Sequence, residues 1–115
     1  MKTLRLGILM VMVPFAAFAE TLATGAQIMA AIGGNTVQGS MVASGAYTEF
    51  YQADGVIKGA DYAGKWRIQG DQMCFDYGAG EDCLSVRLAG DAVTWVKNGV
   101  DDGTGTIVKG NANAY

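Results

Sequence analysis

Closely spaced turn signals constrain the fold of this chain more than any other feature of its sequence. Between them lie short segments in which apolar and polar residues alternate. The clearest signals are Asp54-Gly55, Gly70-Asp71, Gly90-Asp91 and Asn98-Gly99. Such pairs favour tight hairpin turns, and strict alternation is typical of a strand with one buried face. The sequence therefore predicts a succession of short antiparallel strands from residue 35 onward.

About eight strands are expected in this region. They cover residues 36–43, 46–52, 56–60, 62–69, the two arms of a hairpin around Gly78-Ala79, 92–97 and 104–109. Tight turns join neighbours, so the strands should form an up-and-down meander. A meander of this size either stays open as a curved sheet or closes into a barrel, and closure removes the exposed edges. We predict an all-β domain built as a small barrel, closed or half-open.

Residues 24–32 predict one short helix before the strands. Thr24 can cap its N-terminus, Gln27 stands at the capping-box position, and Gly33 or Gly34 can end it. Its apolar stripe consists of Ile28, Met29 and Ile32. Two turns are not stable alone in water. We therefore expect the helix to plug one end of the barrel or to cover an edge.

The first 19 residues have the pattern of a secretory signal peptide. Lys2 and Arg5 precede an uncharged apolar run, which is followed by a small-x-small cleavage site at Ala17-Phe18-Ala19. The run of about 13 residues is shorter than the roughly 20 that a membrane-spanning helix needs. An uncleaved N-terminal anchor is the alternative. We expect export to the periplasm or the medium, with a mature chain that begins at Glu20 and has no membrane span.

This division sets the organisation of the chain and its charge. Residues 1–19 form the signal peptide, 20–34 the segment with the helix, 35–109 the β domain and 110–115 a loose polar tail. The whole chain has a formal net charge of −3, and loss of Lys2 and Arg5 with the signal peptide makes it −5. A surface of this sign disfavours polyanions, so nucleic acid is not an expected partner.

Cys74 and Cys83 are the only cysteines. Exported chains meet an oxidising compartment, where such a pair usually forms a disulfide. A hairpin that turns at Gly78-Ala79 places the two directly opposite each other, at a Cα separation of roughly 4.5–5.5 Å that suits a disulfide. Side chains alternate between the two faces of a strand, and this alternation puts both cysteines on the more polar face of the hairpin. A redox pair is disfavoured, because the spacing is not C-x-x-C and no histidine is present to activate a thiolate.

The missing histidine also limits the chemistry. It excludes serine–histidine and cysteine–histidine nucleophiles and the usual zinc sites. Asp76, Glu81 and Asp82 lie near a hairpin tip, where carboxylates exposed to water are not activated for acid–base catalysis. We therefore expect no enzyme, no cofactor and no metal. The acidic pair Asp101-Asp102, in an expected loop over residues 98–103, leaves the question of a calcium site open.

Aromatic residues are the remaining candidates for a site. Most of them should fill the core, because a small domain needs all the burial that it can obtain. Tyr47, Tyr51 and Trp95 are the ones that we expect at the mouth of a cavity or on a partner-binding face.

A set of spaced motifs resembles a class of small exported bacterial β-domain proteins, mostly of unknown function. The motifs are Asp54-Gly55, Gly64-x-Trp66, Gly70-Asp71, Cys74 and Cys83. Gly64-x-Trp66 is also similar to the GxW of lipocalins, where that motif lies on the first barrel strand, whereas here it lies in mid-chain. The second resemblance therefore implies a lipocalin-like shape only.

Two functions follow as hypotheses. The first is a binding module, which presents a barrel pocket or an aromatic surface to an apolar small molecule or an envelope protein. The alternative is a structural or inhibitory protein-interaction domain with a filled core. A cavity of roughly 300 Å³ or more would favour the first, and a flat exposed aromatic patch the second.

Overall fold

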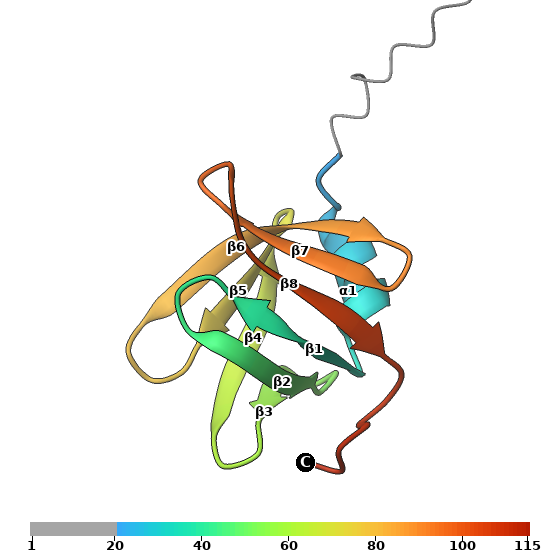
Figure 1. Cartoon of the computed structure of the whole chain (residues 1–115), viewed down its shortest axis with the longest axis vertical. Helices are drawn as coiled ribbons and strands as arrows, with labels where there is room; N and C mark the ends of the chain where they lie inside the picture. The colour runs from blue at the N-terminus through green and yellow to red at the C-terminus, as the bar shows by residue number, and fades with distance from the viewer. Residues whose placement is uncertain (1–20) are drawn as a thin grey trace, which may run out of the picture.

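A computed structural model describes residues 21–115, and the expected signal peptide (residues 1–19) and Glu20 lie outside this range. One helix, α1 (Gly25–Ile32), precedes eight strands. The strands are β1 (Asn35–Met41), β2 (Gly45–Tyr51), β3 (Val56–Lys58), β4 (Ala63–Gln69), β5 (Gln72–Asp76), β6 (Glu81–Ala89), β7 (Ala92–Lys97) and β8 (Val100–Val108). Figure 1 shows these strands wrapped around a common interior, with α1 packed beside them.

The strands form a closed barrel in sequence order. Each strand is antiparallel to the next, and β8 returns to pair with β1, where Gly39 lies opposite Gly105. The predicted up-and-down meander is therefore confirmed. Of the arrangements left open by the sequence, the structure has the closed one.

The start of β8 corrects one expectation. Residues 98–103 were predicted to be a loop, but Asn98 and Gly99 alone make the turn, and β8 begins at Val100. Both turn residues have positive φ, 51° and 77°, as a two-residue hairpin turn of the primed type requires. Asp101 and Asp102 therefore lie on a strand, and Asp101 accepts a hydrogen bond from Arg87. The segment for which the question of a calcium site was left open is therefore part of a strand and not a loop.

Helix α1 closes one end of the barrel. Thr24 and Gln27 form the predicted capping box, with Gln27 N–H donating to Thr24 Oγ1 and Thr24 N–H to Gln27 Oε1. Ile28 and Ile32 are fully buried in the common core. Met29, which we expected in the same stripe, is 44% exposed, because only the helix face that carries residues 28 and 32 packs against the barrel. Within residues 21–115, no helix is long and apolar enough to cross a membrane.

The C-terminal segment is held more firmly than expected. The side chain of Thr36 donates to the carbonyl of Gly110 and accepts from the N–H of Ala112. Asn35 accepts a further hydrogen bond from the N–H of Gly110. The first residues of the tail are therefore attached to β1 rather than loose, and they cover Thr36, which is fully buried.

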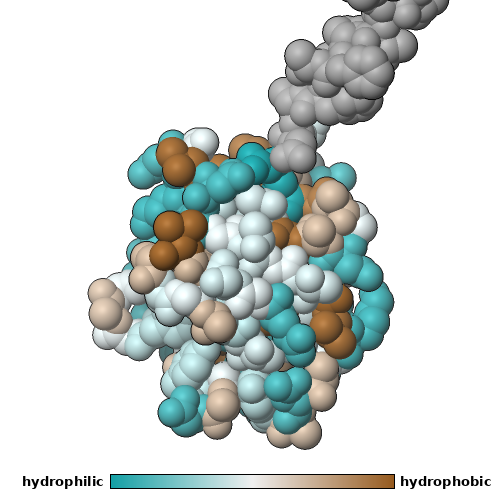
Figure 2. All heavy atoms as spheres, in the orientation of Figure 1, coloured by the Kyte–Doolittle hydropathy of each residue, from teal (hydrophilic) through white to brown (hydrophobic). Residues whose placement is uncertain are grey.

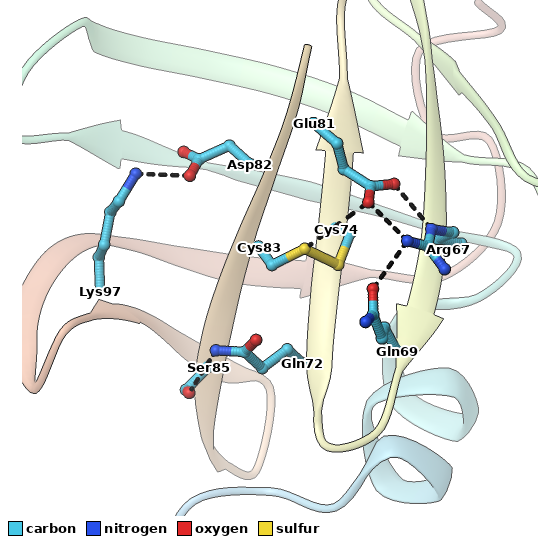
Figure 3. Close-up of a disulfide and its surroundings, with 9 residues drawn as sticks. All are labelled: Arg67, Gln69, Gln72, Cys74, Glu81, Asp82, Cys83, Ser85 and Lys97. Carbon is cyan, nitrogen blue, oxygen red and sulfur yellow. Dashed lines mark hydrogen bonds and ion pairs between the residues drawn. A yellow bond between two sulfur atoms is a disulfide. The ribbon is translucent and has the colours of Figure 1, made fainter.

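The disulfide between Cys74 and Cys83 is present, with a Cα–Cα separation of 3.9 Å. The predicted register is confirmed, because Met73 lies opposite Leu84 and Asp76 opposite Glu81. Figure 3 shows the bridge on the outer face of β5 and β6, among polar side chains. One of these, Arg67, makes a two-pronged ion pair with Glu81 over distances of 2.6 and 2.7 Å.

Reduction of the Cys74–Cys83 bridge should lower the free energy of unfolding by about 2–3 kcal/mol and leave the fold recognisable. The bridge closes a short loop, so its contribution comes mainly from restricting the unfolded chain. Urea unfolding of the oxidised and reduced protein measures the effect. The Cys74→Ser/Cys83→Ser double variant should match the reduced protein. Equal midpoints for the oxidised and reduced forms would contradict the prediction.

Candidate functional site

A cavity of about 530 Å³ opens at the barrel end opposite α1. It lies where β1, β5 and β7 end and where β2, β6 and β8 begin. Its aromatic lining consists of Tyr47, Tyr51, Tyr62, Phe75, Tyr77 and Trp95. Aliphatic residues, among them Met41 and Leu84, complete the apolar wall. The charged residues on the lining are Glu49, Asp82 and Asp102.

Glycines on the inner face make room for this cavity. Gly39 pairs with Tyr47 on one side and with Gly105 on the other, so all three face the interior. A Cβ on Gly105 would lie 2.5 Å from the Tyr47 hydroxyl, which no real contact allows. Gly103 lies opposite Trp95 in the same way. Inward positions without side chains therefore let two large rings lie across β1 and β8.

All three predicted site residues lie on the cavity. Tyr51 and Trp95 are almost fully buried and form its inner wall, whereas Tyr47 is half-buried nearer the mouth. The indole N–H of Trp95 donates to the Tyr47 hydroxyl over 2.7 Å, and that hydroxyl donates to the carbonyl of Thr104 over 3.0 Å. This chain of hydrogen bonds fixes the orientation of both rings.

Glu49 is the residue that the sequence reasoning missed. Its carboxylate faces the cavity from β2, and the residue is only 6% exposed. The hydroxyls of Tyr51 and Tyr62 each donate to it over 2.7 Å. The hydroxyl of Tyr77 lies 2.9 and 3.0 Å from its two oxygens. Hydrogen bonds to an ionised acceptor are the strong ones, and they offset the cost of burying the charge.

The tyrosines reach Glu49 across a gap in the wall. β3 pairs with only two residues of β2, Phe50 and Tyr51, so the first half of β2 has no strand on that side. Tyr62 precedes β4 and Tyr77 follows β5, and their rings meet edge-on with centroids 6.2 Å apart. The two side chains therefore complete the barrel wall beside the cavity.

The cavity keeps its tyrosines in the neutral, donating form. Burial raises the pKa of Tyr51 well above its ordinary value of 10.0, and the charge of Glu49 raises it further. Burial and the same carboxylate also raise the pKa of Tyr62 and of Tyr77. Phenols of this kind donate hydrogen bonds and do not act as bases near neutral pH.

The stability of the protein should fall as the pH rises above about 10. Below that value, Tyr51 holds its proton in both the folded and the unfolded chain. Above it, the unfolded chain ionises while folded Tyr51 does not, because its pKa is raised. Each such tyrosine then lowers the free energy of unfolding by up to about 1.4 kcal/mol per pH unit. Urea unfolding on either side of pH 10 tests this, and Tyr51→Phe should show a shallower decline. A wild-type stability that does not change there would contradict the prediction.

The other acidic candidates lie near the disulfide and at the mouth of the cavity. Cys74, Glu81 and Cys83 are the one grouping among residues 21–115 with the spacing of metal ligands, but both sulfur atoms belong to the disulfide. Asp82 forms an ion pair with Lys97 at the barrel rim. The backbone carbonyl of Asp102 accepts a hydrogen bond from Val42 N–H, and the residue lines the cavity.

A sequence signal for Glu49 does exist. The pattern Tyr47-x-Glu49-x-Tyr51 places a carboxylate on the same face of the strand as two aromatic residues. An inward Glu on an otherwise apolar strand face is a buried charge, and buried charges have partners. What the pattern cannot supply is the identity of those partners, Tyr62 and Tyr77.

Comparison with known proteins adds no relative. No protein-family model, no curated protein and no solved structure matches the chain. The geometry of the cavity is therefore the evidence that bears on function.

Proposed function

We propose that this protein is a small-molecule-binding barrel whose ligand occupies the cavity opposite α1. The observation that carries the proposal is the cavity itself. Its volume of about 530 Å³ lies inside the range of roughly 300–1,000 Å³ that is typical of ligand sites. Mostly apolar walls with a few placed polar groups are also characteristic of such sites.

The lining is preorganised for binding. Trp95 meets Phe75 edge-on at 5.3 Å and Tyr51 at 6.5 Å, so the inner wall consists of interlocked rings. Hydrogen bonds hold Tyr47, Tyr62 and Tyr77. A ligand would find these groups already in place, and little ordering free energy would oppose its binding.

The visible surface offers less support for the alternative, a flat protein-binding face. Figure 2 shows hydrophobic residues scattered among hydrophilic ones on the side that it presents. Large exposed apolar residues such as Val42 and Val100 do occur. Scattered apolar residues are normal on monomers and mark no interface by themselves.

A variant that fills the cavity tests the proposal. Leu84 lines the cavity, and Ser85 follows it on the outer face of β6. Leu84→Trp should abolish the binding of a hexyl probe, either hexanol or hexylammonium, in titration calorimetry. Ser85→Trp adds the same ring outside and should bind like the wild type. Binding that survives in Leu84→Trp would place the ligand elsewhere and overturn the proposal.

Native mass spectrometry of the protein from its own compartment tests the same idea without a chosen probe. The expected result is an added mass of a few hundred daltons at most, on the order of what a cavity of this volume holds. Leu84→Trp should lose that mass. A bound protein in its place would instead favour the interaction-domain alternative.

A further inference from the structure

We propose that the ligand of this cavity is an organic cation, an apolar molecule with one protonated amine that binds against Glu49. The inference rests on the proposed function, that the cavity holds a small molecule, and adds the chemical class. It differs from the sequence expectation, which was an apolar small molecule or an envelope protein.

The charges on the lining are all of one sign. Glu49, Asp82 and Asp102 are acidic, and none of the lysines or arginines between residues 21 and 115 lines the cavity. At the rim, Lys97 pairs with Asp82. Deeper in, the hydrogen-bond partners of Glu49 among the described residues are phenols, which carry no compensating charge. A cation in the cavity would supply the missing positive charge.

The hydroxyls around Glu49 favour an ammonium group with N–H donors. Each tyrosine uses its one O–H to donate to the carboxylate, which leaves lone pairs on its oxygen to accept. An ammonium beside Glu49 would therefore meet a carboxylate and phenol oxygens together. All the donors of the protein at this point are already used, so a ligand that brings only acceptors has nothing to bind.

The aromatic walls favour the same class. Phe75 and Tyr77 are stacked, with centroids 6.5 Å apart and planes 8° from parallel, and Trp95 lies edge-on to Phe75. Aromatic faces attract cations, and the attraction grows where water is excluded. The apolar part of the ligand can lie against Leu84 and Met41, which also line the cavity. An anion would instead face the carboxylates of Glu49 and Asp102, since only that of Asp82 is paired with a lysine.

Three probes that differ only in their head group test the inference: hexylammonium, hexanol and hexanoate. In titration calorimetry at neutral pH and low salt, hexylammonium should bind the wild type at least about tenfold more tightly than hexanol, and hexanoate should bind most weakly. Added salt should weaken hexylammonium but not hexanol, because screening acts only on the charged ligand.

Glu49→Gln isolates the carboxylate. The amide oxygen can still accept from the tyrosines, so the wall should persist, while affinity for hexylammonium falls to within about threefold of that for hexanol. Glu81→Gln makes the same change outside the barrel, beside the disulfide, and should keep the wild-type preference.

The outcomes separate the two proposals. If hexanol or hexanoate binds the wild type as tightly as hexylammonium, the cation inference is overturned while the binding function stands. If none of the three binds, the proposed function fails as well. If Glu49→Gln does not fold, the cation inference is tested by the wild-type protein alone, through the affinity ranking of the three probes and the effect of salt on hexylammonium binding.

Discussion

Trp66→Ala should lower the free energy of unfolding by about 3–5 kcal/mol, close to the whole stability of so small a domain. Trp66 is 5% exposed, and its ring lies close to Gly33 at the end of α1. Its ring meets Tyr51 edge-on at 6.3 Å, and its indole N–H donates to the carbonyl of Gln52 over 2.9 Å. The substitution removes a large buried ring and one of the two donors to that carbonyl, which also accepts from the N–H of Gly55 over 2.9 Å. Denaturant unfolding followed by circular dichroism measures the loss.

Two further variants sharpen this result. Trp66→Phe keeps most of the ring and loses the hydrogen bond, so it should fall between the wild type and Trp66→Ala. Lys65→Ala, at the exposed neighbouring position, should change stability by no more than about 0.5 kcal/mol. A well-folded Trp66→Ala protein with an unchanged midpoint would show that Trp66 does not belong to the core.

Gly39→Ala should cost about 3 kcal/mol, the upper part of the range for overpacking, although it adds one methyl group. A Cβ at this position would lie 1.9 Å from the carbonyl oxygen of Thr104 and 2.5 Å from the Cα of Gly105. Both are backbone atoms of β8, so the strand that closes the barrel would have to move. The effect should appear as a lower urea midpoint and as a loss of hexyl-probe binding.

Ser40→Ala is the matched control for this change. Ser40 is the next residue of β1 and faces outward, so its replacement should stay within about 0.5 kcal/mol. If Gly39→Ala unfolded like the wild type, β1 and β8 could not approach as closely as the closed barrel requires.

Short-range features of the fold could be predicted because their causes are local. The turn residues and the parity of adjacent strands determine which residues oppose each other in a hairpin. That is why the Cys74–Cys83 pairing and its register were correct. The capping box at Thr24 and Gln27 depends on residues three positions apart. The same rule, applied too loosely, predicted a loop before residue 104, where Asn98-Gly99 alone suffices as a turn.

The candidate site was predicted only in part. Tyr47, Tyr51 and Trp95 were expected at the mouth of a cavity or on a partner-binding face. All three line the cavity, but Tyr51 and Trp95 are buried in its inner wall and not at its mouth. Their ring size and inward parity are visible in the sequence. Glu49 shares that parity with Tyr47 and Tyr51, yet its role depends on groups from other strands. An inward carboxylate becomes interpretable only when its partners are known.

The sequence by itself determined the strand succession, the helix cap, the hairpin register and the disulfide, because each follows from residues close together along the chain. Only the tertiary structure decided that β8 closes onto β1, and that Tyr62 and Tyr77 meet Glu49 from 13 and 28 positions away. The curvature of the whole sheet brings these groups together. It depends on close approach at inward glycines such as Gly39 and Gly105 and on the short β3. Curvature is a sum over many strand pairs, so no single motif encodes the charged, aromatic cavity that results.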